Sequence, residues 1–554
     1  MKKGFTLVEL IGVIIILALI MLLAVPPILN SIRSTRNELS DASKKIIYTA
    51  ANLYVSENLN DFPKYDGNTF CVSIDTLSKK EYLPTIVYDS ATGDEIPKDS
   101  LVEIKVENNN YTYNMNNECV EVVAKTLTET LLAQYNESNT TGLVKDSTNS
   151  NLYYYTGTNE QVSNNFLWYG GHQWRVLEFD NSAKTLTLIT QQPLTAIQPA
   201  SAVWTTQSAY NSSYINQWLN DYFYNSLDSS IQSNIQKTTF NVGIYTNVGE
   251  IKTEQKVGLL DEEQYKRAGS ANSFLDIKDS FWLGNRYSSS YVRYVNGDGG
   301  LNYGDTPLSS ECVRAVIKIS DITITGGDGT LASNYQVGNK AINTDNVQVG
   351  EYINVPYSGS DNACGDDNLC TFRVVSKDND SIKVVLNGLL PTTSKWADSA
   401  SDNITTNDLI YTNVLNAFIA DIDSKYITTG TYGVGMYESK NSYTMPQSTT
   451  ITINIGLPTV GEMFSGNDID LSTSSTKTFV DVNTIENPTV SYYYWTMNRE
   501  SSSNVHYVYY LGNQSYFSPS NSGGVRAVIY LKSGTSAITF TGGEGTPNSP
   551  YVLQ

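Results

Sequence analysis

The stretch Met1-Lys2-Lys3-Gly4-Phe5-Thr6-Leu7-Val8-Glu9-Leu10 opens the chain and begins an almost unbroken apolar run that continues to Val25. About 20 apolar residues are enough for a helix to cross a bilayer. The carboxylate of Glu9 lies near the start of this run, although an acidic side chain in a membrane helix costs about 2.5–3.5 kcal/mol on insertion scales. We therefore expect Glu9 to have a cationic partner.

Three kinds of segment combine a basic start with an apolar centre. A secretory signal peptide also needs small residues at a cleavage site, and Ala24-Val25-Pro26-Pro27, which ends this run, does not supply them. An uncleaved membrane anchor accounts for the length of the run but leaves Glu9 unexplained. A third interpretation rests on a resemblance of residues 4–9 to a known family, and the first two remain open.

Residues 4–9, Gly4-Phe5-Thr6-Leu7-Val8-Glu9, resemble the class III leader of type IV pilins and related prepilins. The resemblance implies that a prepilin peptidase cuts between Gly4 and Phe5 and that the new Phe5 amine is methylated. It also implies a stage in the membrane, followed by assembly with other pilin subunits by the pilus machinery. Because Glu9 lies about one helical turn from Phe5, its carboxylate can pair with the Phe5 amine of a neighbouring subunit and fix the register of the filament.

An amphipathic pattern follows and predicts that one long helix continues into a pilin-like headpiece. Pro26 and Pro27, which lack an N–H donor, are expected to kink this helix. The expected apolar stripe consists of Ile32, Leu39, Ile46, Ile47, Leu53 and Val55. It is expected to pack on a small antiparallel sheet whose strands are Phe70–Val72, Leu101–Val106 and Tyr111–Asn114.

The composition does not favour a nucleic-acid partner. The 554 residues carry a formal net charge of -20, and 17% of them are charged. An acidic chain is repelled by phosphate backbones, and the Lys and Arg clusters that a DNA-binding pilin needs are not visible. The length also exceeds that of one ordinary domain several-fold, which predicts further domains after the headpiece.

The cysteines fit an oxidising compartment outside the cell. Cys71 and Cys119 bracket the predicted headpiece sheet, and Cys364 and Cys370 bracket a short polar loop, so two disulfides are expected. The first pair also agrees with the resemblance, because a late disulfide-bounded region is common in pilins.

An internal repeat with a period of about 200 residues organises the rest of the chain. The best-matched stretches are Cys312-Val313-Arg314-Ala315-Val316-Ile317-Lys318-Ile319 and Gly524-Val525-Arg526-Ala527-Val528-Ile529-Tyr530-Leu531, with the later turns Gly326-Gly327-Asp328-Gly329-Thr330 and Gly542-Gly543-Glu544-Gly545-Thr546. Because Cys312 aligns with Gly524, a buried, inert thiol is favoured over a nucleophile. The Gly-rich turns are expected to use glycine for positive φ rather than to bind a cation or a phosphate.

The repeat predicts two tandem globular modules, each with early strands such as Trp174–Phe179 and Thr185–Ile189, an amphipathic helix and a closing strand. The apolar faces of the two helices are Tyr214, Trp218, Leu219, Tyr222 and Phe223 in the first copy and Leu409, Val414, Leu415 and Phe418 in the second. The expected class is α+β with mostly antiparallel strands. The expected domains are a leader (1–4), a transmembrane and filament-core helix (5–30), a pilin headpiece (31–125), module 1 (145–340) and module 2 (341–554).

The modules resemble uncharacterised surface modules of low-GC Gram-positive bacteria. Trp174-Arg175-Val176 and Trp218-Leu219-Asn220 carry this resemblance in module 1, whereas module 2 lacks the Trp-Leu-Asn motif. A more remote resemblance, to C-type-lectin-like folds, rests on the order of helices before a Gly-rich second half that contains Trp. It does not imply sugar binding, because the calcium motifs of that family, Glu-Pro-Asn or Gln-Pro-Asp, are absent from the sequence.

Residues suited to catalysis are scarce. His172 and His506 are the only histidines and fall at non-equivalent places in the two modules, which leaves little material for a His-based acid–base pair or zinc site. Arg314 and Arg526 recur, and each is expected to satisfy backbone carbonyls or a carboxylate. We therefore expect no catalytic residue, no bound metal, no cofactor and no enzyme activity.

Tyrosine-rich segments such as Tyr153–Tyr155 and Tyr507–Tyr510 suit either module cores or surface recognition. Trp282 and Trp495, at equivalent repeat positions, are expected in the cores. The expected function is a minor or tip subunit of a type IV pilus, since two large modules on every subunit would crowd a filament. Such a subunit is membrane-bound by a single span before it enters a surface filament, where its modules bind an unidentified surface ligand. A pseudopilin of a type II secretion or DNA-uptake (competence) machine, and a pilin-anchored surface enzyme, remain alternatives.

Overall fold

The computed structural model describes residues 41–554 except for 59–60, 63–67, 91, 108–109, 246–249, 278, 306–310, 338–343, 361–362, 365–367, 379, 437–448, 461–490, 510–513 and 534–537. The predicted leader and filament-core helix, with Gly4, Phe5 and Glu9, lie outside these residues. None of the helices in the described ranges is long and apolar enough to cross a membrane. Contacts divide the chain into two compact units, unit 1 (Met1–Lys125) and unit 2 (Thr126–Gln554).

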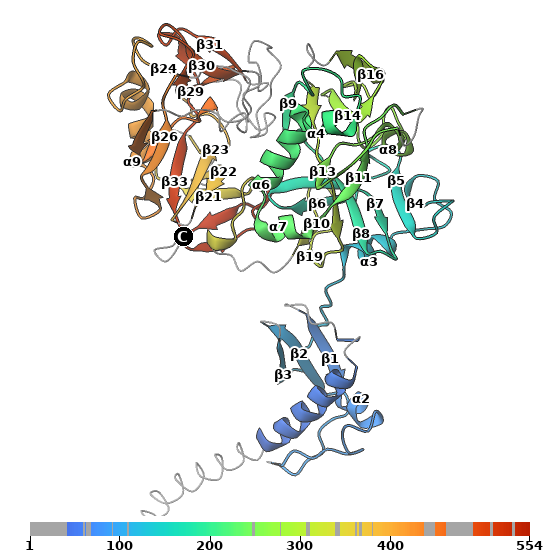
Figure 1. Cartoon of the computed structure of the whole chain (residues 1–554). Coiled ribbons are helices and arrows are strands. Elements are labelled where there is room, and N and C mark those ends of the chain that lie inside the picture. Colours follow the sequence, from blue (N-terminus) through green and yellow to red (C-terminus); the bar gives the residue numbers. More distant parts are fainter. Residues whose placement is uncertain are drawn as a thin grey trace, which may run out of the picture. The chain divides into compact units, whose positions relative to one another are not determined.

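Unit 1 combines one helix, residues 41–57, with a three-stranded antiparallel sheet (Figure 1). The sheet order is β1 (Thr69–Ser73), β2 (Leu101–Glu107) and β3 (Asn110–Met115), and the short helix α2 (Ile74–Lys79) follows β1. Ile47, Ala51 and Val55, spaced four residues apart, lie on one face of the long helix. All three are buried in a core that they share with the sheet.

The predicted strands of unit 1 are present, but part of the predicted apolar stripe is wrong. Ile46 is 60% exposed and Leu53 is 50% exposed. These two residues lie seven apart, two turns along the helix, on a different face from Ile47 and Val55. The sheet of unit 1 therefore covers a narrower stripe of the helix than the sequence pattern predicted.

Unit 2 is mostly β and contains two hydrophobic cores, one between Leu127 and Tyr335 and one between Val347 and Leu553. Both helices and strands occur, as the class α+β requires, but strands prevail and the helices are short. Each core is enclosed by a large sheet that forms a half-barrel.

The larger sheet of the first core has the strand order β10-β18-β8-β7-β5-β4, with β6 on β7 and β13 on β18 (Figure 1). Their bounds are β4 (Gly142–Lys145), β5 (Leu152–Thr156), β6 (Phe166–Tyr169), β7 (His172–Asp180), β8 (Thr185–Thr190), β10 (Ile235–Gln236), β13 (Val257–Gly258) and β18 (Val316–Ser320). A second sheet has the order β16 (Leu301–Asp305), β15 (Tyr291–Val295), β14 (Phe281–Arg286), β17 (Glu311–Val313) and β9 (Thr195–Ile197). Two ribbons pair β11 (Thr238–Asn241) with β12 (Lys252–Gln255) and β19 (Ile324–Gly326) with β20 (Gln336–Val337).

The larger sheet of the second core has the order β25-β33-β23-β22-β21-β35-β34, with β28 on β33. Their bounds are β21 (Tyr352–Pro356), β22 (Leu369–Lys377), β23 (Ser381–Leu386), β25 (Ile427–Thr428), β28 (Ile455–Gly456), β33 (Val528–Lys532), β34 (Phe540–Gly542) and β35 (Tyr551–Leu553). A three-stranded sheet consists of β29 (Tyr493–Arg499), β30 (Val505–Tyr509) and β31 (Gln514–Phe517). Two ribbons pair β24 (Ser394–Lys395) with β32 (Ser522–Gly523) and β26 (Gly430–Gly433) with β27 (Thr450–Ile453).

The same strand pairings recur in the two modules at the positions that the sequence repeat aligns. The pair β7–β8 corresponds to β22–β23, and each has an irregular register, after Val176 in one and after Val374 in the other. The hairpins β14–β15 and β29–β30 likewise share an irregularity, which begins at Trp282 and at Trp495. The repeat is therefore matched in its local distortions as well as in its strand order.

The helices of unit 2 are short, and two of them contain π-helical segments. In module 1 and just before it they are α3 (Leu127–Leu132), α4 (Gln207–Asn211), α5 (Tyr214–Gln217), the π-helix η1 (Trp218–Phe223), α6 (Tyr224–Ser226), α7 (Ser229–Asn234) and α8 (Glu262–Arg267). In module 2 they are the 3₁₀ turn η2 (Thr344–Asn346), the π-helix η3 (Tyr411–Leu415) and α9 (Asn416–Ala420). Most of the predicted apolar faces are buried, whereas Tyr214, Tyr222 and Leu409 are half-buried. The amphipathic pattern does not distinguish α from π geometry over one turn.

Candidate functional site

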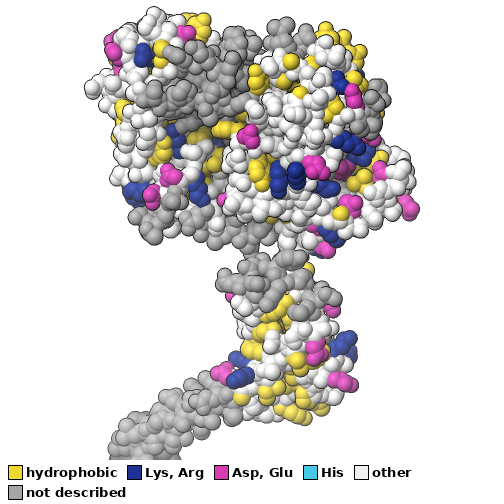
Figure 2. Space-filling model, viewed as in Figure 1, with side chains coloured by type: hydrophobic (Ala, Val, Ile, Leu, Met, Phe, Trp, Pro, Cys, Tyr) yellow, Lys and Arg dark blue, Asp and Glu magenta, His cyan; other side chains and the backbone are white. Residues whose placement is uncertain are grey.

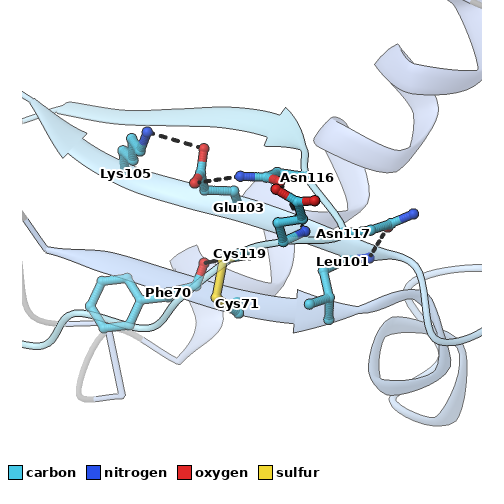
Figure 3. The surroundings of a disulfide bond; sticks show 9 residues. Phe70, Cys71, Leu101, Glu103, Lys105, Asn116, Asn117 and Cys119 are labelled. Carbon is cyan, nitrogen blue, oxygen red and sulfur yellow. Dashed lines mark hydrogen bonds and ion pairs between the residues drawn. A yellow bond between two sulfur atoms is a disulfide. The ribbon is translucent and has the colours of Figure 1, made fainter.

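The structure contains both expected disulfides. Cys71, in β1, is joined to Cys119, which follows β3, so the bond ties the two ends of the unit 1 sheet region together (Figure 3). Beside it, Glu103 accepts a hydrogen bond of 3.0 Å from the Asn116 side chain and forms an ion pair of 3.2 Å with Lys105. Unit 1 is therefore closed covalently at the end of its sheet.

The second disulfide joins Cys364 to Cys370, which lies in β22. Both cysteines are buried at the edge of the second core. Cys312 is also buried, takes no part in either disulfide and pairs in register with Phe281 of β14. Its burial agrees with the interpretation of an inert thiol.

The two recurring arginines are structural, as predicted. Arg314 is 1% exposed and donates hydrogen bonds to the carbonyl oxygens of Thr190 and Leu275, at 2.8 and 2.5 Å. Arg526 is fully buried and donates to the carbonyl oxygen of Leu386 at 2.7 Å. Burial lowers the pKa of Arg314 to about 10, so the guanidinium remains charged at neutral pH.

The Gly-rich turns have the positive φ that was expected of them. Gly327 and Gly329 have φ of 77° and 78°, and Gly543 and Gly545 have φ of 94° and 72°. The Asp328 carboxylate accepts hydrogen bonds from the backbone N–H and the hydroxyl of Thr330, at 3.0 and 2.8 Å. These bonds lower the pKa of Asp328 and commit its carboxylate to the turn itself.

The tyrosine-rich segment Tyr153–Tyr155 contributes two of its three rings to a core. Tyr153 and Tyr155 are buried, and so are Trp282 and Trp495, as predicted for the two tryptophans. Exposed rings occur instead at the tips of the smaller sheets and include Tyr287, Tyr303, Tyr492, Tyr516 and Phe517. Where Figure 2 shows described residues of unit 2, backbone and side chains that are neither hydrophobic nor charged prevail, with charged side chains scattered between them.

A cavity that the sequence did not predict lies within unit 2, where module 1 meets module 2. Its volume is about 230 Å³, and its walls include Trp168 and His172 from module 1 and Tyr352 and Arg373 from module 2. The Trp168 and Tyr352 ring centroids are 6.3 Å apart. Burial, and next the positive charge of Arg373, lower the pKa of His172 to about 3, so this imidazole is neutral at physiological pH. We refer to this cavity as the Arg373 pocket.

The two modules approach each other closely at its edge. Gly171, in the β6–β7 turn, has φ of 75°, and a Cβ atom there would collide with the carbonyl oxygen of Val349. The Asn548 amide also donates a hydrogen bond of 3.3 Å to the Ala332 carbonyl. Glycine is thus required where the β6–β7 turn of module 1 meets module 2.

The residues in the described ranges include no group of three or more His, Cys, Asp or Glu side chains that is placed to hold a metal ion. A family described as a domain of unknown function, DUF6273, matches residues 185–320, which is most of module 1. No curated protein and no solved structure matches the chain. The match covers one module and carries no activity with it.

Proposed function

We propose that this chain is a minor or tip subunit of a type IV pilus-like filament that displays two recognition modules outside the cell. The observation that carries the proposal is the stretch Gly4-Phe5-Thr6-Leu7-Val8-Glu9 before a membrane-length apolar run. Cleavage before Phe5 would leave a hydrophobic helix with an amine at its tip and the Glu9 carboxylate one turn away. Each subunit would then reside in the membrane through a single span before it enters the filament.

The architecture of unit 1 supports this proposal. A pilin-like headpiece needs a helix packed on a small antiparallel sheet, and residues 41–57 pack in this way on β1, β2 and β3. The disulfide between Cys71 and Cys119 is also in the late position expected of a pilin, and a disulfide persists outside the cytoplasm. Ile46 and Leu53, which the sheet leaves exposed, are available to contact neighbouring subunits.

The display of modules for binding, rather than catalysis, fits the two histidines. His172 is 5% exposed and His506 is 3% exposed, and they lie in non-equivalent strands. Since the pKa of His172 is lowered to about 3 by burial, its imidazole is a poor general acid at neutral pH. The proposal therefore assigns the modules to ligand binding and includes no nucleic-acid partner, in keeping with the net charge of -20.

The first test is mass spectrometry of filaments sheared from cells that express the native chain. We expect a mature chain that begins at methylated Phe5, at a low ratio to the bulk filament subunit. Gly4→Val should abolish processing, and Glu9→Gln should reduce recovery in filaments, whereas Glu38→Gln, which removes the same charge elsewhere, serves as the control for Glu9→Gln. An intact Met1 terminus confined to membranes would exclude a pilin, and a stoichiometry equal to that of the bulk subunit would exclude the minor position.

A further inference from the structure

Two residues that line the Arg373 pocket each have a buried hydrogen-bond donor for which the described residues supply no acceptor. Arg373 is 7% exposed; its Nε donates to the Gly350 carbonyl oxygen at 3.3 Å, but its Nη1 meets no acceptor among the described residues. Trp168 is 6% exposed, and its Nε1 likewise meets none. A buried donor without a partner is costly. Arg314 Nη2 also lacks one, but Arg373 and Trp168 differ from Arg314 in lining this cavity, so their donors are suited to an acceptor that comes from outside the chain.

The corresponding arginine of module 1 shows what a purely structural guanidinium looks like at this position. Arg175 pairs in register with Phe166, as Arg373 pairs with Tyr352, and each guanidinium lies against that partner's ring. Each nitrogen of the Arg175 guanidinium has an acceptor, because Nε donates to the Asn165 amide oxygen, Nη1 to the Asn159 amide oxygen and Nη2 to the Val162 carbonyl. The same side chain therefore has an acceptor at every nitrogen in one copy, whereas in the other it lines a cavity and its Nη1 lacks an acceptor among the described residues.

The walls of the pocket define the chemistry of a matching ligand. None of the described residues that line it is Asp or Glu, and the amides of Gln173, Gln192 and Asn548 complete its polar wall. The apolar part of the wall includes the aromatic rings of Trp168 and Tyr352, together with Pro193, Leu194, Leu331 and Pro547. An arginine fork binds a carboxylate best, through two parallel hydrogen bonds. A volume of about 230 Å³ is below that of sites for drug-sized ligands and suits a single sugar-sized molecule.

The pocket is reachable from solvent. Leu331, Pro547 and Asn548, which form part of its rim, are exposed. The inner residues Trp168 and Arg373 are buried, so a ligand would lose water at its charged group while its other end stays at the rim. Partial desolvation of this kind strengthens a charge-assisted hydrogen bond.

We propose that the Arg373 pocket binds an acidic monosaccharide unit, with the carboxylate on Arg373 and the sugar ring against the wall that Trp168 and Tyr352 form together. This inference rests on the proposed recognition role of the modules and names its ligand class. It requires residues from both modules, which explains why two copies are joined in tight contact at Gly171. It does not depend on the filament anchor.

The test is titration calorimetry of the full chain, purified in detergent, with glucuronate as the probe and glucose and acetate as comparisons. Glucuronate should bind, and glucose and acetate should each bind at least tenfold more weakly. Arg373→Met should weaken glucuronate binding roughly ten- to hundredfold, the loss of a charge-assisted hydrogen bond, and Arg373→Lys should weaken it several-fold. Trp168→Phe, which keeps an aromatic ring and removes Nε1, should also weaken it several-fold. Lys395→Met removes an exposed cation of module 2 and should leave the affinity for glucuronate unchanged.

Each arm has an outcome that overturns the proposal. Equal binding of glucuronate and glucose would exclude the carboxylate contact, and equal binding of acetate would exclude the sugar contact. No heat with glucuronate, or unchanged affinity in folded Arg373→Met, would exclude the site; if that variant does not fold, unchanged affinity in Trp168→Phe excludes it instead. A negative calorimetry result does not affect the proposal of a filament subunit, because mass spectrometry of filaments tests that proposal separately, through the N-terminus and the location of the chain.

Discussion

Replacing Cys71 and Cys119 together by serine is expected to destabilise unit 1 by about 4 kcal/mol. A disulfide stabilises a fold mainly by restricting the unfolded chain, and the restriction grows with the logarithm of the loop it closes. This bond joins residues 48 apart, whereas the bond between Cys364 and Cys370 joins residues 6 apart. The same relation gives about 2 kcal/mol for the shorter loop. The two double variants therefore form a matched pair whose effects differ about twofold.

Hydrogen exchange read by mass spectrometry along a urea series would measure both effects in the full chain. A local readout is needed because a chain with several domains does not unfold in one step. Peptides from β1, β2 and β3 should lose protection at a urea midpoint about 1–4 M lower in the Cys71/Cys119 variant, and peptides from β22 should keep theirs. In the Cys364/Cys370 variant, peptides from β22 should lose protection at a lower urea midpoint, with a smaller shift, and peptides from β1, β2 and β3 should keep theirs. An unchanged midpoint in unit 1, or a larger shift for the shorter loop, would refute the reasoning.

Three further predictions follow from single positions. Arg175→Met should lower the unfolding free energy by about 3 kcal/mol or more, because it leaves three buried acceptors, those of Asn165, Val162 and Phe274, without a donor. Arg373→Met should cost about 1 kcal/mol. Urea unfolding of both variants measures the difference, and equal costs would contradict the distinction drawn between them. Gly327→Ala should destabilise module 1, because φ of Gly327 is 77° and a Cβ atom there would collide with the Asn334 carbonyl. A Cβ atom at Gly326 would meet no atom within 4 Å, so Gly326→Ala should leave the thermal unfolding temperature nearly unchanged. Burial, followed by the charge of Arg373, lowers the pKa of His172 to about 3. Between that pH and about 6.5 the unfolded chain binds a proton that the folded chain does not, so the free energy of unfolding falls as the pH falls. The loss of stability between pH 7 and pH 4.5 should therefore be smaller in His172→Asn, and an equal loss would show that this histidine does not contribute.

The sequence predicted the repeat and many of the strands because these depend on local alternation and on self-similarity. Trp174–Phe179 lies within β7, and Trp282 and Trp495 occupy equivalent core positions. These features can be predicted without knowing which segments, distant in the sequence, pack against each other. The hairpin of β4 and β5 was not predicted, since its counterpart is absent from the second large sheet and no repeat marks it.

The sequence did not predict which side of the helix at residues 41–57 is exposed, nor the Arg373 pocket, because both depend on tertiary packing. A helical period shows that a stripe exists but does not fix its width, which is how Ile46 and Leu53 were assigned to the buried face. Arg175 and Arg373 look alike in the repeat, and what separates them is the set of acceptors around each. One signal was available: Asn165, which binds Arg175, precedes Phe166, whereas Glu351 precedes the aligned residue Tyr352.

Module 2 ends beside the place where it begins, because β35 at its end runs parallel to β21 at its start. In module 1, Tyr335 bridges in parallel in the same way to Leu167 of β6, the first strand after the hairpin of β4 and β5. A unit whose entrance and exit are neighbours can be spliced into a chain without pulling its host apart. Duplication of such a unit within one reading frame therefore lengthens a protein by a whole folded module, so the number of modules in a chain can change one copy at a time.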